Sequence, residues 1–107
     1  MAKVVDLTEE NFENETASGV TLVDFWAPWC GPCRIQHSIL DQLAEKIGDK
    51  AKIARVNVED YSPLAAKFGI QAIPTLILLK DGEEEARFIG VTEEKTLQEA
   101  IEKALGS

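Results

Sequence analysis

The chain has 107 residues, of which 45% are hydrophobic and 28% are charged, as in an ordinary globular protein. This length predicts one domain spanning residues 1–107 and leaves no room for a second core. Nineteen acidic residues against eleven Lys and Arg give a net charge of −8, which argues against nucleic acid and anionic membrane surfaces as partners.

The first half of the chain predicts strand, helix, strand and helix in turn. Lys3–Asp6 resembles a brief strand, and Thr8 is placed to cap a short helix. Val20–Trp26 is β-branched and aromatic with little polar alternation, which is typical of a strand buried on both faces. Pro32–Ile47 predicts a long helix that ends at Gly48. Its expected apolar stripe consists of Ile35, Ile39, Leu40, Leu43, Ala44 and Ile47.

The second half predicts a strand and a helix, then a hairpin and a closing helix. Lys52–Val58 has the pattern of another central strand, and Ser62–Phe68 begins with a serine and a proline, as helices often do. Thr75–Leu79 and Glu85–Ile89 flank a tight Lys80–Gly82 turn. The last helix is expected to be capped by Thr92, and its apolar face comprises Leu97, Ala100, Ile101, Ala104 and Leu105.

This order of elements predicts an α/β fold. Strands that alternate with helices and then close with a hairpin favour a mixed central sheet of about five strands. About four helices are expected to cover both faces of that sheet.

The chemistry of the sequence centres on a dithiol at a strand-to-helix junction. Cys30 is expected at the helix N-terminus, where the helix dipole and free backbone N–H groups favour a thiolate and lower the pKa of that thiol. Gly31 allows a tight turn, and Pro32 suits a first helical turn. Two intervening residues leave the sulfurs within disulfide reach. Cys30 is therefore predicted to be the exposed nucleophile and Cys33 the resolving thiol.

Two other interpretations of the cysteines remain open at this stage. They could form a stable buried disulfide or stay as inert thiols. They could also supply half of a metal site, although zinc prefers four ligands and His37 is the only further soft candidate. We expect no metal and no bound cofactor.

The chain resembles the thioredoxin family over essentially its whole length. The resemblance rests on Val23–Cys33, which contains the WCGPC motif, on Phe68–Thr75, and more weakly on Lys80–Gly82 and Gly90. It implies the thioredoxin fold, a dithiol–disulfide cycle on proteins, and recycling by a separate thioredoxin reductase. No flavin or nicotinamide motif is present in the sequence.

The resemblance also implies roles for residues around the dithiol. Asp24 matches the family's buried carboxylate, which assists proton transfer at the resolving cysteine; an aspartate satisfied by backbone donors is the alternative. Arg55 falls where the family often has a lysine, and it either keeps Asp24 ionised or lies at a strand edge on the surface. Pro74 matches a cis proline that faces the dithiol. The expected substrate-docking surface consists of Trp29, Ala72, Ile73, Pro74, Gly90 and Val91, with Trp26 in the core.

The sequence departs from the family pattern just after the motif. Ser38 replaces a proline, so the helix is expected to be straighter, or bent mildly by a hydrogen bond of Ser38 to the preceding turn. His37 replaces a small residue, about 40° around the helix from Cys33. It either tunes proton transfer at Cys33 and Asp24 or leans outward without a role. Gln36 falls on the apolar side of the helix, and its polar side chain is accounted for only by exposure at the helix start.

Together these features predict a general protein-disulfide reductase that acts through a mixed-disulfide intermediate. An oxidase or isomerase of the same fold is the alternative within redox chemistry. A redox-independent binding module that uses the patch around Trp29 is the alternative outside it.

Location and assembly are predicted from simpler features. The amino-terminal residues contain no basic region, apolar stretch and cleavage site in succession, so a cytoplasmic location is expected. The longest apolar run, Ile73–Leu79, is far shorter than the roughly 20 residues of a membrane span. We expect a monomer.

Overall fold

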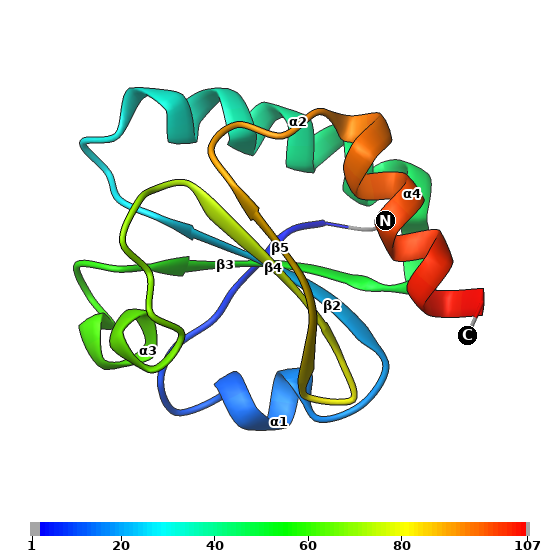
Figure 1. Cartoon of the computed structure of the whole chain (residues 1–107), viewed down its shortest axis with the longest axis horizontal. Coiled ribbons are helices and arrows are strands. Elements are labelled where there is room, and N and C mark those ends of the chain that lie inside the picture. Colours follow the sequence, from blue (N-terminus) through cyan, green and yellow to red (C-terminus); the bar gives the residue numbers. More distant parts are fainter. Residues whose placement is uncertain (1–2, 107) are drawn as a thin grey trace.

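A computed structural model describes residues 3–106 as a central sheet with helices on both sides (Figure 1). The strands lie in the order β1-β3-β2-β4-β5. Strands β1, β3 and β2 are mutually parallel, β4 pairs antiparallel with β2, and β5 pairs antiparallel with β4. The mixed five-stranded sheet and four α-helices confirm the predicted α/β architecture. The elements are β1 (Val5–Asp6), α1 (Phe12–Thr16), β2 (Val20–Trp26), α2 (Gly31–Ile47), β3 (Lys52–Asn57), α3 (Ser62–Lys67), β4 (Thr75–Lys80), β5 (Glu83–Ile89) and α4 (Glu94–Gly106), with a 3₁₀ turn at Gly48–Lys50.

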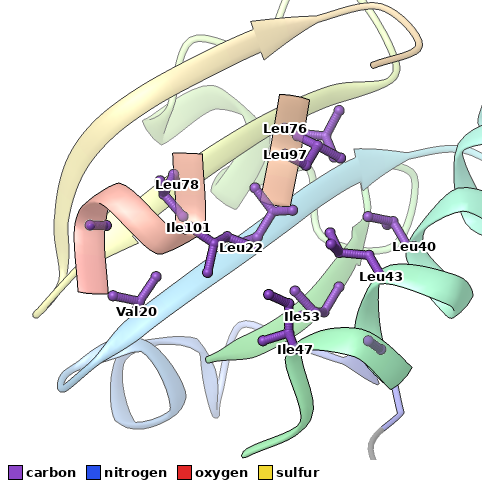
Figure 2. Packing of buried hydrophobic residues seen from close by; sticks show 12 residues of the cluster. Val20, Leu22, Leu40, Leu43, Ile47, Ile53, Leu76, Leu78, Leu97 and Ile101 are labelled. Carbon is purple, nitrogen blue, oxygen red and sulfur yellow. The ribbon is translucent and has the colours of Figure 1, made fainter. Parts of the chain in front are cut away.

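Strand β2 is buried on both faces, as its composition predicts, because side chains alternate between two cores. One core packs the sheet against α2 and α4 (Figure 2). Its side chains include Val20, Leu22, Leu40, Leu43, Ile53, Leu76, Leu97 and Ile101. The other core lies on the opposite face, beside α1 and α3, and includes Phe12, Val23, Phe25, Val56, Leu64 and Ile77.

The same alternation sends Asp24 and Arg55 to the α2 side of the sheet. Asp24 follows Leu22 at a spacing of two, and Arg55 follows Ile53 in the same way, so each shares the face of that core residue. The two residues are also register partners on the neighbouring strands β2 and β3. A carboxylate and a guanidinium therefore lie beneath the first turns of α2.

The hairpin between β4 and β5 has the predicted tight turn. Asp81 and Gly82 have φ angles of 51° and 83°, and two positive φ angles in succession suit the right-handed twist of the flanking strands. The Asp81 carboxylate also accepts a 2.8 Å hydrogen bond from the Gly19 backbone N–H.

Two details of the closing helix differ from prediction. Helix α4 begins at Glu94, and the Thr92 hydroxyl donates to the Gly90 carbonyl at 3.0 Å, so Thr92 is not its cap. Leu105 is 38% exposed, because it lies beside the buried face that Leu97, Ile101 and Ala104 form.

Helix α2 runs without interruption through Ser38. Within residues 3–106, no helix is both long and apolar enough to cross a membrane.

Candidate active site

The two cysteines lie where β2 gives way to α2, and a disulfide joins them. Cys30 is the N-cap of α2, and its sulfur accepts a 3.2 Å hydrogen bond from the Cys33 backbone N–H. Gly31 and Pro32 occupy the first helical positions. Proline lacks a backbone N–H, and at these positions an N–H would have no partner within the helix. The helix start therefore directs a backbone donor and its dipole at the Cys30 sulfur, as the sequence predicts.

The disulfide is less accessible than the sequence suggested. Cys30 is 5% exposed and Cys33 is 1% exposed, so Cys30 is the more accessible sulfur but is not openly exposed in the oxidised pair. The reason is that apolar side chains surround the junction. They are those of Trp26, Ala27, Val58 and Ile73.

The Ile73–Pro74 loop closes one side of the disulfide. This peptide bond is cis, and the Ile73 carbonyl oxygen lies 3.9 Å from Cys30 Sγ. Pro74 is itself buried, and its carbonyl accepts a 2.8 Å hydrogen bond from the Gly90 N–H. The Thr75 hydroxyl donates to the Ala72 carbonyl at 2.6 Å, which fixes the turn beside the sulfur.

An apolar groove of about 260 Å³ opens next to the dithiol. Trp29 forms part of it and is 67% exposed, while the indole N–H donates to the Glu59 carboxylate. The sequence predicted Trp29, Ala72 and Ile73 at this surface but not four further residues, which come from the position just after β3, from α3 and from the loop after α3. These are Val58, Ala65, Ile70 and Gln71. Gly90 and Val91 do not line the groove, although Gly90 reaches the site through Pro74.

Asp24 is fully buried, and neither of its carboxylate oxygens has a hydrogen-bond partner among the described residues. The alternative of a core aspartate satisfied by backbone donors is therefore wrong. Burial raises the pKa of this carboxyl above its ordinary value, while the polar contact with His37 and the charge of Arg55 act to lower it.

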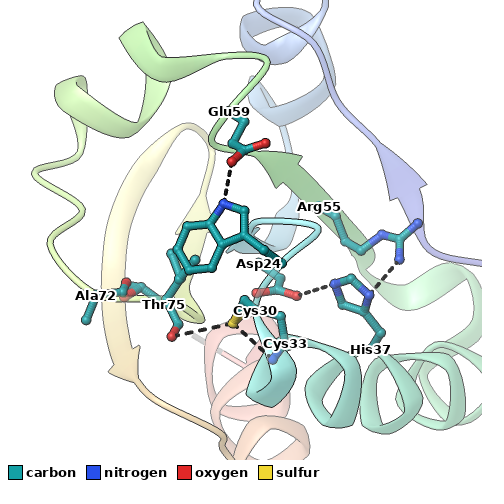
Figure 3. Close-up of a disulfide and its surroundings, with 10 residues drawn as sticks. Asp24, Cys30, Cys33, His37, Arg55, Glu59, Ala72 and Thr75 are labelled. Carbon is teal, nitrogen blue, oxygen red and sulfur yellow. Dashed lines mark hydrogen bonds and ion pairs between the residues drawn. A yellow bond between two sulfur atoms is a disulfide. The ribbon is translucent and has the colours of Figure 1, made fainter.

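His37 lies between the buried carboxylate and the guanidinium (Figure 3). Its Nε2 is 3.4 Å from Asp24 Oδ2, a polar contact longer than a well-formed hydrogen bond, and its Nδ1 is 3.2 Å from Arg55 Nη1. Arg55 also holds Asp6 through Nε and Nη2, both at 3.0 Å. The alternative in which His37 leans outward is therefore wrong, and Arg55 contacts both the surface carboxylate of Asp6 and the ring beside Asp24.

Gln36 corrects a second expectation. Its side chain is fully buried, donates to the Thr92 carbonyl at 3.1 Å and accepts from the Thr92 N–H at 2.7 Å. Ile35, which was assigned to the apolar stripe, is instead 58% exposed. At ~100° per residue, Gln36 lies about 60° from Cys33 and Ile35 about 160° away, so turning Cys33 inward turns Ile35 outward.

The metal alternative gains no support from the arrangement of these side chains. His37 faces Asp24 and Arg55, and a guanidinium beside Nδ1 would repel a cation. Among residues 3–106, no group of three His, Cys, Asp or Glu side chains could hold a metal ion.

Fold and site together define a class of α/β protein with a redox-reactive Cys-Gly-Pro-Cys pair at a strand–helix junction. A family model described as Thioredoxin matches residues 3–103. The thioredoxin of Bacillus subtilis strain 168 is 43% identical over 102 residues, which cover 95% of this chain and 98% of that protein. The thioredoxin of Staphylococcus saprophyticus is 44% identical with the same coverage.

Solved structures of thioredoxins have the same fold as this chain. A mutant thioredoxin from Halobacterium salinarum NRC-1 superposes with a TM-score of 0.89 at 30% identity, covering 96% of this chain and 91% of that one. The thioredoxin of Malassezia sympodialis has the same TM-score and identity, with coverages of 98% and 93%. The chain belongs to the thioredoxin family, and its cysteine pair makes it a thiol–disulfide oxidoreductase.

Proposed function

We propose that this chain reduces disulfides of other proteins, with Cys30 as the attacking thiolate and Cys33 as the resolving thiol. Cys30 attacks one substrate sulfur, and the other substrate sulfur leaves as a thiolate and takes up a proton. The thiol of Cys33 then loses its proton to Asp24 and attacks Cys30 in the mixed disulfide. The substrate sulfur that was bonded to Cys30 then leaves as a thiolate. Two electrons have passed to the substrate, and the Cys30–Cys33 bond has formed.

The contact between the Cys30 sulfur and the start of α2 carries this proposal. The sulfur accepts from the Cys33 N–H as the N-cap of a 17-residue helix, and a negative charge on sulfur strengthens both that bond and its interaction with the helix dipole. Cys33 lies one turn further in and is the more buried of the two, which suits attack within the complex.

Asp24 supports the second step as a base. A carboxylate whose pKa is raised by burial accepts a proton more readily than an exposed one does, and it lies on the sheet face that α2 covers. Once the reduced substrate has been released, the proton on Asp24 returns to solvent.

The groove beside Trp29 suits an extended segment of a substrate protein. Trp29, Ala72 and Ile73 offer apolar contacts, and the Ile73 carbonyl next to Cys30 can accept a hydrogen bond from a substrate backbone N–H. We also assign Gly90 and Val91 to the proposed surface, because Val91 is 43% exposed and the Gly90 N–H bonds the carbonyl of the buried Pro74.

The partners follow from this chemistry. Each turnover leaves a disulfide, so a separate thioredoxin reductase has to supply two electrons, and a reducing compartment, the cytoplasm, is the location that we propose. The substrates are proteins that contain disulfides.

We further propose that the chain acts as a monomer, because one chain carries both cysteines and the whole groove.

Reduction of insulin with dithiothreitol as electron donor tests the function. The native chain should accelerate the reaction, Cys30→Ser should abolish it, and Cys33→Ser should trap a substrate on Cys30 as a mixed disulfide. A native chain no faster than dithiothreitol alone would contradict the proposal.

The double variant Cys30→Ser/Cys33→Ser separates the reductase from a redox-independent binding module. A reductase loses all turnover, whereas a binding module retains its partner. A series of redox buffers that fixes the potential of the pair separates the reductase from an oxidase or isomerase of the same fold.

A further inference from the structure

The protonation state of the His37 ring can be assigned from its neighbours. Its Nδ1 lies 3.2 Å from Nη1 of Arg55, and a guanidinium carries hydrogen-bond donors only and stays charged in proteins. Nδ1 must therefore act as the acceptor and carry no proton. The single proton of the neutral imidazole is then on Nε2, the nitrogen that lies 3.4 Å from Asp24 Oδ2.

We propose that His37 is a positioning residue for the resolving step, held by Arg55 as the neutral Nε2–H tautomer so that its N–H points at Asp24 and favours the carboxylate form. This proposal rests on the proposed function, in which ionised Asp24 takes the proton of Cys33.

The burial of Asp24 explains why such a donor matters. Asp24 is fully buried without a hydrogen-bond partner among the described residues, so a polar N–H 3.4 Å away acts in a medium where little else stabilises the charge. Burial raises the pKa of Asp24, and the polar contact with His37 and the charge of Arg55 oppose that rise. His37 thus extends the pH range in which Asp24 can act as a base.

Arg55 fixes the ring on its other side. A proton on Nδ1 would bring an N–H against the guanidinium donors, so Arg55 holds the ring in the tautomer whose Nδ1 accepts. Arg55 is itself held by Asp6 from β1, and the ring packs edge-on against Trp26 with centroids 4.8 Å apart. The ionisable neighbours of His37 on its own helix are Cys33, Arg34 and Asp41, of which the last two are exposed.

Two substitutions of His37 test whether it acts as a fixed hydrogen-bond donor or as a group that gains and loses a proton. His37→Ala removes the donor. His37→Gln keeps an amide N–H for Asp24 and an amide oxygen for Arg55, but it cannot titrate. For the fixed donor that we propose, Gln should rescue what Ala loses.

The first measurement is the pH profile of mixed-disulfide resolution between pH 6 and pH 8. His37→Ala should be several-fold slower than the native chain at pH 6 and close to it at pH 8, because the pKa of Asp24 rises. His37→Gln should follow the native profile. An unchanged profile for His37→Ala, or a His37→Gln profile that matches His37→Ala, would overturn the proposal.

The second measurement needs no turnover. Nitrogen-15 NMR of His37 should show Nδ1 unprotonated and Nε2 protonated at pH 8, and Arg55→Met should produce a mixture of tautomers. A native ring protonated on Nδ1 overturns the assignment. If the native chain does not reduce insulin, the proposed function fails on its own. If it does, and Asp24→Asn slows resolution but His37→Ala does not, only the role of His37 fails.

Discussion

The side-chain amide of Gln36 pairs with both backbone polar groups of Thr92, at 3.1 Å and 2.7 Å, although the two residues are 56 positions apart. This pair links the second turn of α2 to the loop that follows β5. The same loop carries Gly90, whose N–H bonds the carbonyl of Pro74 beside the dithiol. Gln36 therefore couples the redox helix to the loop that carries part of the proposed substrate surface.

Replacement of Gln36 by Leu should destabilise the protein by about 1–3 kcal/mol, because the Thr92 N–H and carbonyl lose their partner in a partly buried place. Urea unfolding measures the change. Gln42→Leu is the matched control, since it makes the same substitution at an exposed position of α2 and should change stability little. Equal midpoints for the two variants would contradict this interpretation.

Asp24→Asn should raise stability at neutral pH. Because the pKa of Asp24 is raised by burial, the folded protein keeps its proton to higher pH than the unfolded chain, whose carboxyl ionises near 3.8. Native stability therefore falls as pH rises from 3.8 through the folded-state pKa. Asparagine avoids that loss, so its advantage should be full at pH 8 and vanish near pH 3.

The control for this prediction is Asp41→Asn, which removes the same charge from an exposed position on α2. Urea unfolding of both variants and the native chain at several pH values provides the comparison. A pH-independent difference between Asp24→Asn and the native chain would argue against a raised pKa.

Trp29→Ala should raise KM for protein substrates by about tenfold while leaving the turnover of a small disulfide unchanged, because Trp29 is an exposed aromatic side chain of the groove. Leu105→Ala truncates a partly exposed apolar residue at the end of α4 and should leave both unchanged. Steady-state rates with insulin and with a small aromatic disulfide decide the point. A loss in kcat for the small disulfide would instead place Trp29 in the chemical step.

In the reduced protein, Cys30 should react with iodoacetamide at pH 7 at least about tenfold faster than Cys33. The N-cap position favours the Cys30 thiolate, and Cys33 is the more buried sulfur. Peptide mapping after brief alkylation measures the ratio. Similar rates at the two sites would remove the basis for treating Cys30 as the nucleophile.

Much of the fold could be predicted because it depends on local patterns. Val20–Trp26 is uniformly apolar apart from Thr21 and Asp24, and the structure buries it on both faces. Asp81 and Gly82 tolerate the positive φ angles of the hairpin turn, so the turn could be predicted from these two residue types. The apolar stripe of α2 was placed correctly in its second half and wrongly at Ile35, where the inward turn of Cys33 decided the orientation of the helix face.

The sequence by itself determined the order of the elements and the place of the cysteine pair at a helix start, because these depend on residues close together in the chain. Only the tertiary structure decided the surroundings of that pair: Gln36 against Thr92, His37 between Asp24 and Arg55, and a groove shared by Trp29 with residues of α3 and the loop after it. The physical reason is that a buried polar group needs a partner, and which one it meets is set by strand register and helix packing, not by neighbours in the chain.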